Sequence, residues 1–160
     1  MPPLTLIHVV ISLVGIVSGV VVVRGVLASQ HHRGWVSTFL WSTLATSATG
    51  FLFFPLKPLL PGHLFGVITF LVLGPAMYGL YARQLVGGWR KTYVIGSLVA
   101  LYLNVFVLIV QLFRKVPALH LMAPTESEPP FAIAQLVTLI LFITLGVLGV
   151  KRFRAEPTAA

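Results

Sequence analysis

The chain has 160 residues, of which 58% are hydrophobic and only 9% are charged, whereas soluble domains carry about 25% charged residues. Its mean hydropathy is +0.99, and a soluble fold of this size could not bury so much apolar surface. The net charge is +8 and cysteine is absent, which excludes disulfides, thiolate metal sites and iron–sulfur clusters. The composition therefore predicts an integral membrane protein.

Unbroken apolar runs of about 20 residues, without strict alternation, predict an all-α, polytopic membrane helix bundle with five transmembrane helices. Basic residues stand at the ends of these runs as helix anchors, and no basic stripe with interleaved aromatics indicates a nucleic-acid partner. The expected partner is the lipid bilayer. We expect a single transmembrane domain over residues 1–154 and a disordered tail at 155–160.

The first helix is predicted at about 4–27. It lacks a basic leading region and a small-residue cleavage pattern, so we interpret it as a retained helix. His8, Ser12 and two glycines, Gly15 and Gly19, are spaced by four, three and four residues, which places them on one helix face. We expect this face to point into the bundle.

A basic turn follows, in which His31 and His32 are expected to be solvated interfacial groups. The second helix is predicted at about 35–54 and is rich in hydroxyls. One face carries Thr38, Ser42, Thr46 and Thr49. Such hydroxyls either return hydrogen bonds to their own backbone and pack against protein, which we favour, or line a watery path.

The third helix is predicted at about 63–85, after a proline-rich connection. His63 begins it, and Pro75 should kink it. The fourth helix, at about 92–113, places Asn104 near mid-membrane, where an unpaired amide is costly, so we expect a hydrogen bond to a neighbouring helix. Gln111 lies near the end of this helix.

Residues 114–130, RKVPALHLMAPTESEPP, are too polar and too proline-rich for hydrocarbon and are predicted to form an ordered connecting segment over one end of the bundle. The fifth helix follows at about 131–150, with Gln135 in its first turns, and ends in a basic cluster. Together, Asn104, Gln111 and Gln135 are the main intramembrane polar candidates.

The distribution of basic residues predicts the orientation. With five spans and the N-terminus outside, eight of the eleven basic residues lie on the cytoplasmic side and three outside. The outer three are Lys57, Arg114 and Lys115. The predicted arrangement is N-terminus outside and C-terminus cytoplasmic, in a bacterial inner membrane.

This orientation gathers three histidines and both loop glutamates on the outer side, where two ligand schemes are open. In the first, His8 and His63 are axial ligands of haem b between the first and third helices, with Lys57, Arg114 or Lys115 near the propionates. In the second, a metal ion is held by His63, His120 and Glu126 or Glu128. The third alternative is a purely structural polar cluster.

The residues give little support to ion-coupled transport or to enzymatic catalysis. The chain has no Asp, and its three Glu lie outside the predicted spans, so proton- or sodium-coupled transport is disfavoured. No nucleophile-and-base pattern or phosphate loop indicates an enzyme.

The strings TSATGFLFF, GGWRKTYV, LYLNVFVLIVQLFRKVPAL and APTESEPPF resemble those of small bacterial multi-pass inner-membrane proteins that carry no assigned activity. In layout alone, the early His/Arg turn, the histidine opening the third helix and the later LY-containing helix are similar to small membrane proteins associated with cytochrome oxidase assembly. The fifth helix and the long outer segment depart from that pattern.

The leading functional expectation is a non-enzymatic accessory or structural subunit of a larger membrane complex, or a homo-oligomer. The alternatives are a haem b or metal-binding redox protein and a channel or carrier for a small solute along the second helix.

Overall fold

The structure is a computed structural model that describes residues 3–53 and 61–154. Within these ranges every regular element is a helix, and they are listed in chain order as α1 (Pro3–Ala28), α2 (Arg33–Phe53), α3 (Pro61–Tyr81), α4 (Trp89–Lys115), α5 (Pro117–Met122) and α6 (Pro129–Arg152). Prolines open α3, α5 and α6, where the missing backbone N–H costs nothing and the fixed φ suits the first helical turn.

The helix bundle expected from the sequence is confirmed as an all-helical, multi-pass architecture. Four helices are long and apolar enough to cross a membrane: α1, α3 from His63, α4 and α6. The many hydroxyls of α2 lower its hydropathy, so α2 does not qualify by composition although it has 21 residues.

The helix ends differ from the predicted ones by one to four residues, and two of these differences change the local structure. The third helix ends at Tyr81 rather than near 85, because Gln84, Leu85 and Gly87 adopt positive φ in the turn that follows. The connecting segment 114–130 is partly helical, since Val116 ends α4 in an extended conformation and the next residue begins α5. The predicted tail at 155–160 and Lys57 lie outside the described residues.

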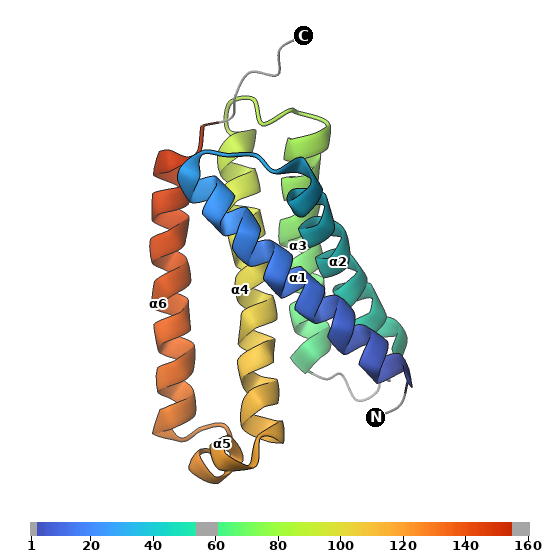
Figure 1. The fold of residues 1–160 in the computed structure, drawn as a ribbon, viewed down its shortest axis with the longest axis vertical. Coiled ribbons are helices and arrows are strands. Elements are labelled where there is room, and N and C mark those ends of the chain that lie inside the picture. Colours follow the sequence, from blue (N-terminus) through green and yellow to red (C-terminus); the bar gives the residue numbers. More distant parts are fainter. Residues whose placement is uncertain (1–2, 54–60, 155–160) are drawn as a thin grey trace.

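Figure 1 shows α3, α4 and α6 standing side by side along the long axis, while α1 crosses them obliquely and α2 runs antiparallel beside α1. α5 lies beneath the ends of α4 and α6. The start of α1 and the end of α6 lie at opposite ends of the bundle. The core between the helices is built from buried Phe39, Leu40, Leu73, Val94 and Leu101.

Glycines set the closest helix approaches. A Cβ at Gly96 of α4 would lie 2.6 Å from the backbone oxygen of Val72 and 2.8 Å from the Cβ of Ala76, both on α3. A Cβ at Gly19 of α1 would lie 2.6 Å from Cδ1 of Leu101. Small residues therefore let α3 and α1 pack directly on α4, as expected for helices in lipid.

We name the two ends of the bundle by their content. The basic end comprises the α1–α2 turn, the α3–α4 turn and the C-terminal end of α6. Its cationic residues are Arg24, Arg33, Arg83, Arg90, Lys91, Lys151, Arg152 and Arg154. The α5 end is the opposite end, with the start of α1, the end of α2, the start of α3 and the connecting segment.

Contacts at the basic end tie segments distant in sequence. Arg90 donates hydrogen bonds from Nη1 to the backbone oxygens of Val150, at 3.2 Å, and of Phe153. The centroid of the His31 ring lies 6.1 Å from the ring centroid of Tyr93 and 6.5 Å from that of Phe153. His31 is exposed, as predicted for a turn residue, and its ring also contacts the aromatic pair of Tyr93 and Phe153.

Candidate functional site

The α5 end brings His8 of α1 against the last turns of α2. Its Nδ1 lies 2.8 Å from Oγ1 of Thr49, and its Cε1 lies 3.8 Å from the place where a Gly50 side chain would begin. The antiparallel course of α1 and α2 produces this pairing, because it sets the start of one helix beside the end of the other. The inward face predicted for α1 is confirmed, since Gly15 and Gly19 are buried and His8 and Ser12 are half-buried.

His63 lies in the first turn of α3 and is 4% exposed, so it is more deeply buried than an interfacial residue. Its ring centroid lies 5.5 Å from that of Phe51 on α2, at an interplanar angle of 31°. His8 and His63 therefore contact neighbouring positions of α2, which packs against both α1 and α3.

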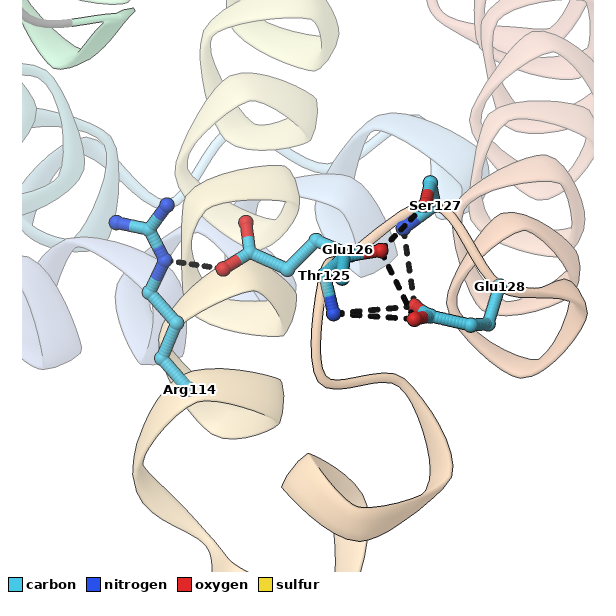
Figure 2. Close-up of polar contacts among 5 residues, drawn as sticks. All are labelled: Arg114, Thr125, Glu126, Ser127 and Glu128. Carbon is cyan, nitrogen blue, oxygen red and sulfur yellow. Dashed lines mark hydrogen bonds and ion pairs between the residues drawn. The ribbon is translucent and has the colours of Figure 1, made fainter.

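The connecting segment forms a local polar network of its own (Figure 2). Arg114, at the end of α4, pairs through Nε with Oε1 of Glu126. Glu128 instead accepts hydrogen bonds from the backbone N–H and hydroxyl of Thr125, at 3.1 and 2.8 Å, and from the backbone N–H of Ser127, at 3.1 Å. The two carboxylates therefore point toward different partners.

The hydrogen bonds also affect the ionisation of Glu128. Partial desolvation raises its pKa, but the hydrogen bonds from Thr125 and Ser127 together outweigh that effect and hold the pKa below the ordinary glutamate value. Glu128 is thus kept as a carboxylate that orders the turn before α6.

The metal scheme drawn from His63, His120, Glu126 and Glu128 is not assembled within residues 3–53 and 61–154, where no three His, Asp or Glu side chains are grouped to hold an ion. The reason is the path of the connecting segment. α5, which carries the exposed His120, packs on α4, whereas His63 opens α3. Both glutamates are bonded within the segment itself.

A second polar group lies at mid-bundle. Asn104 of α4 donates from Nδ2 to Oγ1 of Thr43 on α2, at 3.3 Å, which confirms the predicted bond between helices. Gly15 of α1 opens onto the same place, since a Cβ there would lie 3.3 Å from Ser42 Oγ and from Thr43 Oγ1. Sequence reasoning had not singled out Thr43, which is fully buried. Its spacing of four from the buried Ser47 is the signal that could have found it.

Hydroxyls near this interface mostly bond to their own helices. Ser12 donates to the backbone oxygen of His8 at 2.7 Å, Ser42 to that of Thr38 at 2.6 Å, and Thr49 to that of Ala45 at 2.8 Å. The prediction that the hydroxyl face of α2 returns hydrogen bonds to its own backbone is confirmed for Thr38, Ser42 and Thr49. Within the described residues, the buried Oγ1 of Thr46 has no hydrogen-bond partner. The bonded hydroxyls satisfy their polar atoms while allowing α1 and α2 to approach closely.

Gln111 and Gln135, the two glutamines predicted near the outer helix ends, differ in their contacts. Gln135 of α6 donates from Nε2 to the backbone oxygen of Phe106 on α4, at 3.3 Å, and within the described chain its buried Oε1 has no hydrogen-bond partner. Gln111 is half-buried near the end of α4. The α4–α6 interface therefore contains one polar link near the α5 end.

Taken together, the described polar groups join α1 to α2, α2 to α4 and α4 to α6 by hydrogen bonds in a low-dielectric surrounding. Comparison with protein-family models, with curated proteins and with solved structures finds no match.

Proposed function

We propose that this chain is a non-enzymatic subunit of the inner membrane that binds a larger membrane-protein complex through α6. The observation that carries the proposal is the surface of α6. None of the residues in its most apolar 18-residue stretch is buried, although the corresponding stretch of α4 is 44% buried. One face of α6 packs on α4 and α1, and the opposite, outward face is left available to a partner.

The outward face of α6 is suited to packing against another helix. It combines large aliphatic side chains with the small hydroxyl residue Thr144, whose Oγ1 bonds to the backbone oxygen of Ile140 at 2.8 Å. Helices associate in lipid through van der Waals packing rather than through hydrophobic burial, so a partner must offer a complementary surface. The aliphatic residues of this face are Ile133, Leu136, Val137, Ile140 and Leu141.

The cysteine-free sequence allows a direct test. A single cysteine at Ile140 would carry a photo-crosslinker, and native membranes would be irradiated before extraction. A matched cysteine at Val17, which is 60% exposed on α1, is the control. We expect one heteromeric adduct from position 140 and none from position 17. An adduct with the mass of two copies of this chain, or equal labelling from both positions, would refute the proposal.

The topology that we propose for this subunit has α2 as a fifth span, the N-terminus outside and the C-terminus in the cytoplasm. With 21 residues, α2 is about 31 Å long, close to the thickness of the hydrocarbon core of about 30 Å. The concentration of eight cationic residues at the basic end supports a cytoplasmic location for that end. An impermeant maleimide applied to intact cells should label Ser127→Cys but not Ser29→Cys; the reverse pattern would invert the topology, and labelling of both would remove α2 as a span.

Haem b binding by His8 and His63 is a second candidate function. The observation in its favour is that both imidazoles contact α2 within three consecutive residues, at Thr49, Gly50 and Phe51. The carrier hypothesis along α2 also stays a prediction, with no such observation beside it.

A further inference from the structure

A groove of about 450 Å³ runs between α4 and α6 on the lipid-facing side of the bundle. Its walls are apolar. They include Ile95, Val99 and Tyr102 from α4, and Phe142, Gly146 and Val150 from α6. Ile95 is half-exposed at the rim of the groove.

Gly146 gives the groove its depth. A Cβ at this position would meet no atom within 4 Å, whereas a Cβ at Gly149, one turn further along α6, would lie 3.0 Å from side chains of Val26 and Val94. The two glycines therefore have different roles. Gly149 lets α6 pack on the bundle, and Gly146 leaves open space beside it.

The length of the groove matches one leaflet of a bilayer. On α6 it extends from Leu139 to Lys151, a rise of about 18 Å along the helix. Half of the hydrocarbon core is about 15 Å thick. An acyl chain of one leaflet could thus lie along the groove for most of its length.

Lys151 is the charged residue among those that line the groove, and it stands at the basic end. A second cation, Arg90, bonds nearby to the backbone oxygens of Val150 and Phe153. The acidic residues that the structure describes, Glu126 and Glu128, lie at the opposite end of the bundle. The mouth of the groove is therefore positively charged and suits an anionic head group.

We propose that the α4–α6 groove binds an anionic phospholipid, with one acyl chain along the groove and the head-group phosphate on Lys151. The site is separate from the outward face of α6 proposed to bind a partner protein, and it does not depend on that proposal. Its selectivity comes from the combination of an apolar channel of one-leaflet length and a cation at one end.

The test is native mass spectrometry of the full chain in detergent with added dioleoyl phosphatidylglycerol or phosphatidylcholine at equal concentration. We expect the wild type to retain phosphatidylglycerol about fivefold better, the ratio that a single favourable basic contact provides. Lys151→Ala should bring the two lipids to near parity, whereas Arg152→Ala, a neighbouring cation that does not line the groove, should keep the preference.

Variants that fill the groove with a larger side chain test whether the acyl chain binds there. Gly146→Leu should abolish retention of both lipids, while Thr144→Leu, on the same helix outside the groove, should bind as the wild type does. Ile95→Trp fills the groove from α4 and serves if the first variant fails to fold. Undiminished retention in a folded groove-filling variant, or equal loss of preference in the Lys151 and Arg152 variants, would overturn the assignment.

Discussion

Replacing Gly96 by alanine should separate α3 from α4. The new Cβ would lie 2.6 Å from the backbone oxygen of Val72, and ordinary contact begins near 3.4 Å, so the helices must move apart by about 0.8 Å or tilt. The obstacle is backbone and the Cβ of Ala76 rather than the end of a flexible side chain, so rotamer changes cannot relieve it. Overpacking of this kind costs about 1–3 kcal/mol.

The same substitution at Gly146 is the matched control, because its Cβ would enter open space. Alanine is a better helix former than glycine by up to about 1 kcal/mol, so Gly146→Ala should be neutral or slightly stabilising. Titration of the purified proteins with SDS in mixed micelles, followed by tryptophan fluorescence, compares the two free energies of unfolding. Trp89 is a suitable reporter, since its ring lies 5.1 Å from that of Tyr78 across the α3–α4 turn. Equal stability of the two variants would show that α3 and α4 do not meet at Gly96.

Three further predictions concern polar groups. If haem b is bound, protein purified from iron-replete cells should show a Soret band that is lost in a His8→Ala, His63→Ala double variant; a colourless wild type would end that hypothesis. Burial, followed by the charges of neighbouring basic groups, lowers the pKa of His31 below 6.5, so the folded state binds fewer protons and stability should fall as pH drops through 6.5 toward 5. His31→Phe should flatten this dependence in unfolding measurements between pH 8 and 5, and an unchanged slope would contradict it. A double-mutant cycle on Asn104→Ala and Thr43→Ala should give a coupling of about 0.6 kcal/mol; a value near zero would mean that their 3.3 Å contact adds nothing.

The helix positions followed from the sequence because the constraint is local. A segment that crosses hydrocarbon must satisfy its own backbone and must be about 20 residues long, so apolar runs and their basic or proline-rich ends reveal where helices lie. The same reasoning predicted that most cationic residues would lie at one end of the bundle. It also anticipated that Asn104 would bond to another helix, since hydrocarbon offers an amide no alternative.

The partners of the polar groups were decided only by the tertiary structure. Periodicity places His8 on an inward face, but the antiparallel packing of α1 on α2 is what sets it beside Thr49. Glu126 and Glu128 looked like contributors to a metal site, yet the fold of the connecting segment directs them to local donors. Helix rotation and crossing depend on contacts between residues far apart in the chain, and no single apolar run encodes them.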